Sequence, residues 1–201
     1  PLASPNDLCC DAAGRIYFTS RPGVEDPTKG NANAVYRIDP VGKLTQLLKS
    51  PDIHMPNGIV ISPDNQTLYL IEAHPDADRN RNILAFDLGS DGSLSNRRTL
   101  INFYPGRSGD GMSIDSRGNL YVAAGLRATR KTSETLDTRP GIHVVSPAGN
   151  LLAFMRTPED TITNCTFGGP DLKTLFVTCG TKLLSIRTTI PGKANYRPLG
   201  K

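Results

Sequence analysis

The sequence contains no tryptophan, and its 201 residues include only three histidines and four cysteines. The cysteines form no Cys-x-x-Cys pair and have no zinc-type spacing to a histidine, which argues against a zinc finger. No apolar run reaches the roughly 18 residues that a membrane-spanning helix needs. Glycine-rich phosphate loops of the Rossmann or Walker type are absent, and so is the Gly-x-Ser-x-Gly elbow of serine hydrolases.

The charge pattern argues against a nucleic-acid partner. Lys and Arg number 23 against 19 Asp and Glu, which gives a net charge of +4. The basic residues are scattered, and the densest stretch, Arg127 to Lys131, has no aromatic residues between its charges. A nucleic-acid interface concentrates its positive charge on one face. We therefore expect no nucleic-acid partner and no membrane partner, and oligomeric state is left open.

The four cysteines leave two interpretations open. Cys9 and Cys10 are adjacent in a predicted strand, so they point to opposite faces. Cys165 and Cys179 are equally distant from a predicted turn at residues 171–173, so they could be cross-strand neighbours and form a disulfide. Free thiols favour a reducing, cytoplasmic compartment. A secreted or periplasmic location stays open, because the chain starts at Pro1 without a methionine.

A repeat of 51 to 54 residues runs through the whole chain. Each copy opens with an asparagine or aspartate followed by a short apolar run, and the four copies start at Asn6, Asn57, Asp110 and Asn164. A turn and a second β-rich run follow each opening, as in Thr67-Leu68-Tyr69-Leu70. Strand repeats of this length are typical of β-propeller blades. The sequence therefore predicts one all-β domain over residues 1–201 whose four opening residues meet in space.

Each repeat divides into short strands separated by Pro-, Gly- and Asn-rich turns. In the second repeat we predict strands at Gly58–Ser62, Thr67–Glu72 and Asn82–Leu88, and a fourth from Leu94 onward. The third and fourth strands of the other repeats are predicted at Ala34–Asp39, Leu44–Leu48, Gly141–Ser146, Leu151–Met155 and Lys182–Thr188. A polar, proline-containing tail follows the last strand. Three longer loops, Ser20–Asn33, Ala73–Asn80 and Leu126–Pro140, follow second strands and are expected to share one rim.

The opening residues are the candidate chemical groups. Carboxylate and amide oxygens are hard ligands that suit Ca²⁺, Mg²⁺ or Mn²⁺, and a bound ion lowers the pKa of its water. Asp110 is the only acid among the four openings, and Asp7 stands one position into the first strand. Asn-Gly and Asp-Gly are also ordinary turn residues, which is the alternative interpretation. Asp11 and Asp115 are predicted to be turn formers.

The histidines show no catalytic motif. His54 lies close to the predicted mouth of the site, His74 lies in a rim loop, and His143 lies in a third strand, where a structural role is expected. None of them pairs with a serine in a recognisable nucleophile motif.

The four openings together resemble the gluconolactonase, regucalcin and luciferin-regenerating enzyme family. The segments that carry the resemblance are Pro5-Asn6-Asp7, Pro56-Asn57-Gly58, Gly109-Asp110-Gly111-Met112 and Asn164-Cys165-Thr166-Phe167-Gly168-Gly169. The segment from Thr132 to Ile142 is most similar to the bacterial gluconolactonase branch. The resemblance covers nearly the whole chain and implies a six-bladed propeller, of which this chain would supply about four blades and lack N-terminal ones.

The resemblance also implies a site. One divalent ion would be held by Asn57, Asp110 and a first-blade glutamate that has no counterpart here, and Ca²⁺ is expected before Zn²⁺, Mn²⁺ or Mg²⁺. Asn6, with Asp7 beside it, would contact the substrate, and Asp110 would be the catalytic carboxylate. Ser4 stands where regucalcin-like members carry a sugar-gripping arginine, so sugar recognition by that route is not expected.

The expected function is metal-dependent hydrolysis of a small-molecule lactone. A phosphotriester or aryl-ester hydrolase on the same fold is one alternative, because a fold does not fix its chemistry. A non-catalytic metal-binding scaffold is another. A condensing enzyme of the strictosidine-synthase type would require a catalytic glutamate, and no spacing marks Glu72 or Glu134 for that role.

Overall fold

The computed structural model describes residues 4–22 and 33–194 of the chain. Within these ranges fifteen β-strands form four antiparallel sheets, and no helix occurs. The first sheet contains β1 (Pro5–Cys10), β2 (Ile16–Ser20), β3 (Ala34–Ile38) and β4 (Leu44–Lys49). The second contains β5 (Pro56–Ile61), β6 (Thr67–Glu72), β7 (Asn82–Leu88) and β8 (Leu94–Asn102). The third contains β9 (Gly109–Ile114), β10 (Leu120–Ala124), β11 (Gly141–Val145) and β12 (Leu151–Arg156), and the fourth contains β13 (Ile162–Gly168), β14 (Thr174–Cys179) and β15 (Lys182–Arg187).

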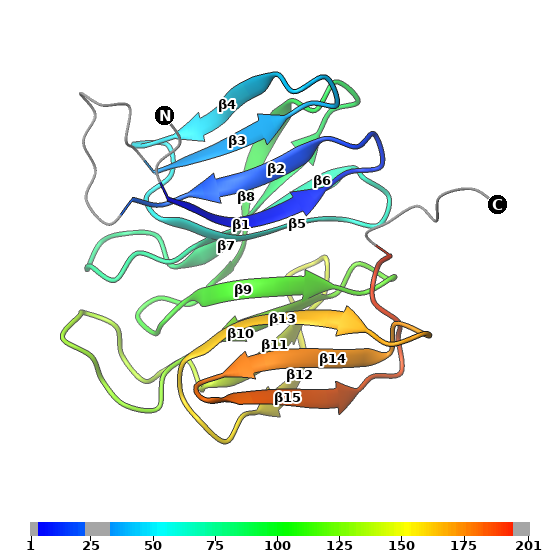
Figure 1. Ribbon diagram of the computed structural model, residues 1–201. Coiled ribbons are helices and arrows are strands. Elements are labelled where there is room, and N and C mark those ends of the chain that lie inside the picture. The colour runs from blue at the N-terminus through cyan, green and yellow to red at the C-terminus, as the bar shows by residue number, and fades with distance from the viewer. Residues whose placement is uncertain (1–3, 23–32, 195–201) are drawn as a thin grey trace.

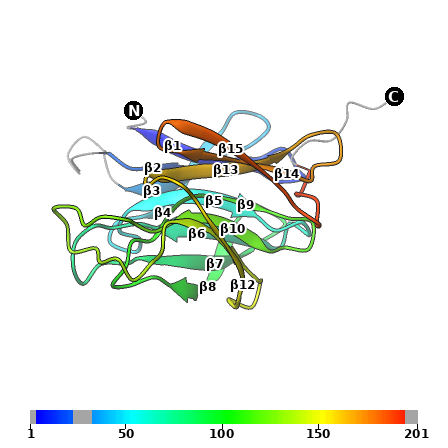
Figure 2. The ribbon, with the colours of Figure 1, turned by 90° about the horizontal axis from the view of Figure 1, so that it is seen from below.

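The sheets are arranged as successive blades of a β-propeller. Strands follow each other in chain order within every sheet, so β1, β5, β9 and β13 are the inner strands. Figure 1 shows these four strands following one another across the middle of the molecule, and each contacts the next. Seen from below, in Figure 2, the outer strands β8 and β12 lie away from them. The all-β propeller prediction is confirmed, whereas the total of six blades stays a prediction.

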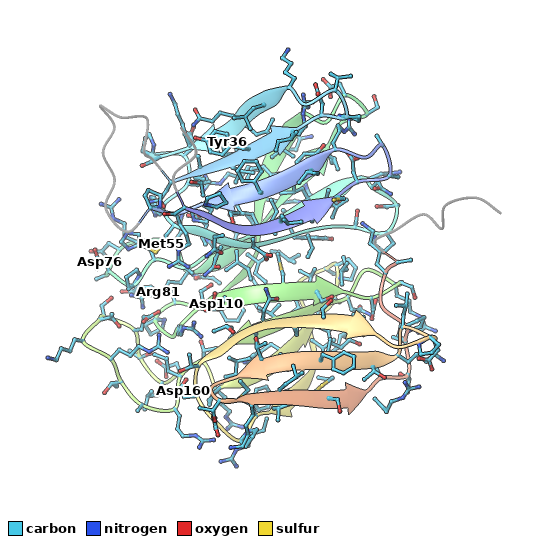
Figure 3. The ribbon with its side chains drawn as sticks, in the orientation of Figure 1. Tyr36, Met55, Asp76, Arg81, Asp110 and Asp160 are labelled. Atoms are coloured by element: carbon cyan, nitrogen blue, oxygen red, sulfur yellow. The ribbon has the colours of Figure 1, made fainter. Side chains whose placement is uncertain are left out.

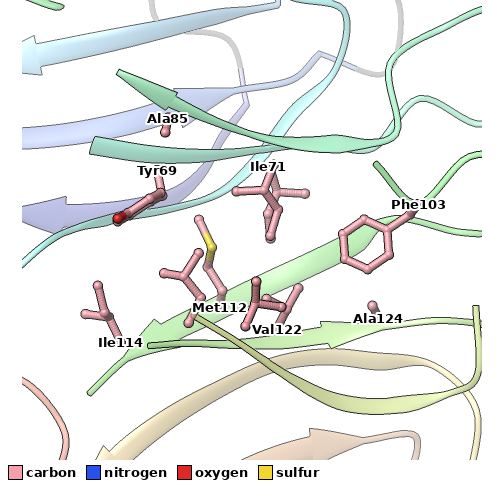
Figure 4. Packing of buried hydrophobic residues seen from close by; sticks show 11 residues of the cluster. Tyr69, Ile71, Ala85, Phe103, Met112, Ile114, Val122 and Ala124 are labelled. Carbon is pink, nitrogen blue, oxygen red and sulfur yellow. The ribbon is translucent and has the colours of Figure 1, made fainter. Parts of the chain in front are cut away.

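Apolar side chains fill the space between neighbouring blades. In β6, Leu68 and Leu70 pack toward the first blade, whereas Tyr69 and Ile71 pack toward the third. Alternate residues of a strand point to opposite faces, so a blade between two neighbours needs apolar residues at consecutive positions. Figure 4 shows the core between the second and third blades, where Ile71 lies opposite Val122.

The turns between first and second strands depend on aspartate. In the first blade, Asp11 Oδ1 accepts main-chain hydrogen bonds from Ala13 and Arg15 at 2.9 and 3.0 Å. In the third blade, Asp115 Oδ1 does the same for Arg117 and Asn119 at 2.8 and 2.9 Å. These bonds satisfy turn N–H groups that have no strand partner. The prediction that both aspartates form turns is confirmed.

Most predicted strands match the observed ones. β6 and β7 have the predicted bounds, and β5 begins at Pro56, two residues before the predicted start. Of the two interpretations of the cysteines, the free thiols hold: Cys165 lies opposite Val177 and Cys179 lies opposite Ile162, so the two do not form the possible cross-strand pair. The fourth blade is followed by an ordered segment, since Gly192 pairs with Asp115. Most of the predicted Ser20–Asn33 loop lies outside the described residues.

Residues 4–22 and 33–194 contain no helix that is long and apolar enough to cross a membrane.

Truncation of an inter-blade side chain should destabilise the protein strongly. Leu84 on β7 is fully buried between the first two blades. We expect Leu84→Ala to lower the free energy of unfolding by about 2–5 kcal/mol, because the cavity stays unfilled. Urea unfolding followed by circular dichroism measures the change. Leu151→Ala, on the exposed outer strand β12, is the matched control and should change stability by less than about 0.5 kcal/mol. Equal losses would contradict the packing described here.

Candidate functional site

The opening residues of the inner strands lie at the same end of adjacent strands. Asn6, Asn57 and Asp110 each directly follow the first residue of β1, β5 and β9. Asn57 is buried, Asp110 is partly exposed and Asn6 is exposed. Each of these strands has an irregular register at this end, between Pro5 and Leu8, between Pro56 and Ile59, and opposite Val122–Ala124. Bulges of this kind re-aim side chains at the rims of sheets.

Two glycines allow the strands to approach closely at this end. A Cβ atom on Gly58 would lie 2.8 Å from the carbonyl oxygen of Asp110. A Cβ atom on Gly111 would lie 2.3 Å from Cγ of Asn164. A larger residue at Gly58 would press on the main chain of β9, and one at Gly111 would displace the Asn164 side chain. The glycines therefore bring Asn57, Asp110 and Asn164 into one neighbourhood.

Asp7 links the first two blades. Its Oδ2 accepts a hydrogen bond from the main-chain N–H of Ile59 at 3.2 Å, and its Oδ1 accepts one from Leu8 at 2.9 Å. Burial is the main cause that raises the pKa of Asp7, and the negative charge of Asp110 raises it further. The two main-chain bonds act in the opposite direction, because they stabilise the carboxylate.

Asp110 is held by an arginine. Arg107 Nη2 donates to Asp110 Oδ2 at 2.8 Å, and the Arg107 side chain is only 10% exposed. Within the described chain the other oxygen, Oδ1, accepts no hydrogen bond. Asp110 thus has one oriented oxygen and one that is available to a ligand or a water molecule.

Asn57 also has an available side chain. The Thr19 hydroxyl donates to the main-chain oxygen of Asn57 at 2.9 Å and fixes the backbone there. The amide group of Asn57 has no hydrogen-bond partner among the described residues, although the residue is only 3% exposed. Its side-chain atoms are not among the fully buried polar atoms without a partner, so the amide can be reached by water or by a ligand.

In the fourth blade, Asn164 occupies the position that corresponds to Asp7 in the first blade, whereas the sequence repeat aligned it with Asn6. The main-chain N–H of Asn164 donates to the Thr178 hydroxyl at 3.0 Å, as that of Asp7 donates to Thr19 at 3.1 Å. Asn164 Oδ1 accepts from the N–H of Cys165, as Asp7 Oδ1 accepts from Leu8. The alignment of the four openings is therefore shifted by one residue in the fourth blade at this end.

The rim above the site depends on a buried arginine that sequence reasoning missed. Arg81 is 1% exposed and donates to the carbonyl oxygens of His74, Pro75, Asp76 and Pro105. It also donates to Ser133 in the loop of the third blade. Figure 3 shows Met55, Arg81 and Asp110 at the same end of the molecule. The prediction that loops share one rim is confirmed for residues 73–80 and 126–140, since Ser133 also bonds to Pro75.

A buried glutamate supports the segment that leads into Asn57. Glu72 Oε2 accepts from the main-chain N–H of His54 at 2.6 Å, whereas Oε1 is buried without a partner in the described residues. Burial raises the pKa of Glu72 to about 7. Burial and the nearby positive charge of Arg79 lower the pKa of His54, whose Nδ1 accepts from the N–H of Asn80. His143 packs against Phe103 and Phe154, which fits its predicted structural role.

A groove runs along the inner strands below these residues. Its volume is about 370 Å³, and its walls include Asp7, Ile59, Met112 and Asn164. Lys193 reaches into the groove and donates to the carbonyl oxygen of Ile61, the last residue of β5. The groove is large enough for a small organic ligand with one end at Asp7.

The oxygen donors fit part of a shell for a hard divalent ion. The Asn57 amide and the Asp110 carboxylate are of the type that Ca²⁺ prefers, but such an ion takes six to eight oxygen ligands. The residues of ranges 4–22 and 33–194 include no cluster of three His, Cys, Asp or Glu side chains that could hold a metal. Asn57 and Asp110 would therefore supply two ligands of a larger set.

Comparison with known proteins gives consistent matches. The family model described as "SMP-30/Gluconolactonase/LRE-like region" matches residues 1–181. A gluconolactonase of Zymomonas mobilis is 32% identical over 200 residues, which cover 92% of this chain and 50% of that protein. The solved structure of a gluconolactonase from Xanthomonas campestris has a TM-score of 0.71 and 31% identity, and the match covers 95% of this chain and 58% of that one.

A third comparison concerns the fold alone. The structure of regucalcin from Agrobacterium tumefaciens, which is described as a calcium-binding protein, has a TM-score of 0.69 at 21% identity. That match covers 97% of this chain and 64% of the other. By comparison with the gluconolactonase of Zymomonas mobilis, the chain spans about half the length of that curated relative.

Ionisation of Glu72 should lower the stability of the fold. The folded-state pKa of about 7 is above that of an unfolded glutamate, so folding favours the neutral Glu72 carboxyl group. The resulting contribution to stability is fully present below about pH 4.3 and is lost as pH rises through 7. At about 1.4 kcal/mol per pKa unit, a rise from about 4.3 to about 7 corresponds to a loss of roughly 4 kcal/mol. We expect the free energy of unfolding to fall between about pH 4.3 and about pH 7, and Glu72→Gln to remove most of that fall.

Chemical denaturation at several pH values measures the effect. Glu159→Gln is the control, because an ion pair with Lys182 lowers the pKa of Glu159. An unchanged pH dependence in Glu72→Gln would show that Glu72 is not the group that titrates.

Proposed function

Because the chain belongs to the SMP-30/gluconolactonase/LRE-like family, we propose that the protein hydrolyses a lactone with the aid of one divalent metal ion. The observation that carries the proposal is the position of Asn57 and Asp110, whose available oxygens lie at the same end of adjacent inner strands. The same two residues match the metal ligands that the family resemblance implies, and this match supports a metal-dependent lactonase. The fold alone would not specify the reaction.

Asp110 is proposed as the catalytic carboxylate. Its hydrogen bond to Arg107 fixes the orientation of the carboxylate, as the position of a general base requires. A water molecule beside Oδ1 would give up a proton to Asp110 as its oxygen attacks the lactone carbonyl carbon. When the ring C–O bond breaks, the same proton passes to the leaving alkoxide, and the product is a hydroxy acid. Asp7, which lines the groove, is the second candidate base.

Asn57 and Asp110 are the proposed protein ligands of the metal, and Asn6 and Asp7 are the proposed substrate contacts. A bound divalent ion would polarise the lactone carbonyl and stabilise the charge that develops on its oxygen. Calcium is the proposed ion because the donors are an amide and a carboxylate oxygen. The exposed Asn6 side chain can orient the substrate or the attacking water through a hydrogen bond.

Removal of the Asp110 carboxylate should remove turnover. In the full-length protein supplied with Ca²⁺, Asp110→Ala is expected to lower kcat for aldonolactone hydrolysis by at least about 100-fold, because it removes both the base and a metal ligand. Ring opening is measured by the release of acid. Asp87→Ala, a surface carboxylate on β7, is the control and should keep normal activity.

Retention of more than a tenth of the activity in Asp110→Ala would contradict the proposal. If the wild-type protein binds Ca²⁺ but opens no lactone, the non-catalytic scaffold becomes the better account. If it hydrolyses aryl esters or phosphotriesters and no lactone, a different hydrolase on the same fold is indicated.

A further inference from the structure

A second cavity lies in the third blade, between the loop that joins β10 to β11 and the outer strand β12. Its volume is about 340 Å³, and all of its lining residues fall between Leu126 and Arg156. It shares no lining residue with the groove below Asp7. Figure 1 shows the loop, in yellow-green, extending beyond the end of β10. The cavity is therefore a candidate site that the proposed lactonase chemistry does not use.

Three arginines line this cavity, and no acid does. They are Arg127, Arg139 and Arg156, and all three are exposed. Arg156 ends β12 opposite Gly141, and Arg139 stands two residues before Gly141, so both come from the same end of the paired strands β11 and β12. Like charges gathered around one small cavity repel each other, and an anion bound among them removes that cost.

The guanidinium groups are almost unused within the described chain. Arg127 Nη2 donates to the carbonyl oxygen of Thr157 at 3.3 Å, which is a neutral acceptor. The side chains of Arg139 and Arg156 form no hydrogen bond or ion pair with any described residue. The chain is described without a gap from residue 33 to residue 194, so every sequence neighbour of the three arginines is included. Most of their N–H donors are therefore available to a ligand.

Acids close in sequence to these arginines are engaged elsewhere. Asp137 Oδ2 accepts a hydrogen bond from the hydroxyl of the threonine two residues before it, at 2.5 Å. Glu159 pairs with Lys182. Asp160 Oδ2 accepts from the main-chain N–H of Arg127 at 2.9 Å. None of these acids lines the cavity, so the described residues provide no carboxylate that pairs with the three arginine side chains.

Apolar side chains lie beside the charges. Leu126 is 1% exposed, and its N–H donates to the carbonyl oxygen of Thr138 at 3.2 Å, which closes the base of the loop. Phe154 is partly buried, with its ring 4.9 Å from that of His143. Leu136 also lines the cavity and is 45% exposed. A cavity of this size with apolar walls and a few charged groups suits a small organic ligand.

We propose that this cavity binds a small organic phosphate monoester that carries an apolar group. The three arginines bind the phosphate, and Leu126, Leu136 and Phe154 contact the apolar part. A phosphate monoester carries about −1.5 to −2 charges near pH 7 and offers three acceptor oxygens to the planar guanidinium groups. A monocarboxylate would balance only one of the three positive charges. The site is separate from the proposed lactonase centre and does not rest on it.

The test is calorimetry on the full-length protein without added Ca²⁺, with phenyl phosphate, inorganic phosphate and benzyl alcohol as probes. We expect phenyl phosphate to bind about tenfold more tightly than inorganic phosphate, because its ring buries apolar surface, and benzyl alcohol to bind more weakly than either. The double variant Arg139→Gln/Arg156→Gln should lower the affinity for phenyl phosphate by about 10-fold or more. Leu136→Ala should weaken phenyl phosphate and leave inorganic phosphate unchanged.

Two variants serve as controls. Arg98→Gln removes an exposed arginine that pairs with Asp87 in the second blade, and it should keep the wild-type affinity. Asp110→Ala should also keep it, which separates this cavity from the lactonase centre. Absence of phenyl phosphate binding by the wild-type protein at millimolar concentration, or an unchanged affinity in the double arginine variant, would overturn the inference. Equal binding of benzyl alcohol and phenyl phosphate would do so too, because it would show a site without preference for the anion.

Discussion

Apolar packing between the faces of neighbouring blades holds the described structure together, and the site depends on it. Leu68 and Leu70 pack on one side of β6, and Tyr69 and Ile71 pack on the other. Such a blade cannot bury both faces alone, so successive blades stack and their inner strands come to lie side by side. The opening ends of those strands then meet because the blades stack, whatever residues the openings carry.

The close approach of the inner strands at this end determines which charged groups lie near one another. Gly58 and Gly111 leave room for the neighbouring strand, and the main-chain N–H of Ile59 reaches the Asp7 carboxylate. Asp110 is hydrogen-bonded to Arg107 there, and burial is the main cause that raises the pKa of the nearby Asp7, with the charge of Asp110 raising it further. Opposed charges in a partly buried site are a common feature of binding and catalytic centres. The packing of the blades thus determines the positions and the burial of the charged side chains in the site.

Much of the fold could be predicted from the sequence, because both the repeat and the strands leave local signals. The bounds of β6 and β7 follow from β-rich runs between turn residues, and Asp11 and Asp115 cap turns within four residues of themselves. The one-residue shift of Asn164 could not be predicted, since it depends on a bulge between paired strands. A disulfide between Cys165 and Cys179 was excluded by the same register.

The arginines and Glu72 gave no sequence signal, because their partners are distant in the chain. Arg81 binds Ser133, 52 residues away, and Arg21 contacts Met55, 34 residues away. Glu72 ends an ordinary strand, and its burial follows from tertiary packing. By contrast, Asn57 and Asp110 are singled out by their position in the repeat, and their role in the site stays a prediction. Position in the repeat thus selects candidates from sequence alone, whereas residues with distant partners become visible only in the structure.

The central claim is that Asn57 and Asp110 together hold one divalent ion at the shared end of the inner strands. The most direct measurement is anomalous X-ray diffraction from crystals of the full-length protein grown with Mn²⁺ as a substitute for Ca²⁺. The account predicts a single strong anomalous peak within coordination distance of Asn57 Oδ1 and an Asp110 carboxylate oxygen. A peak bound by other residues, or none at this end of the groove at saturating Mn²⁺, would contradict it.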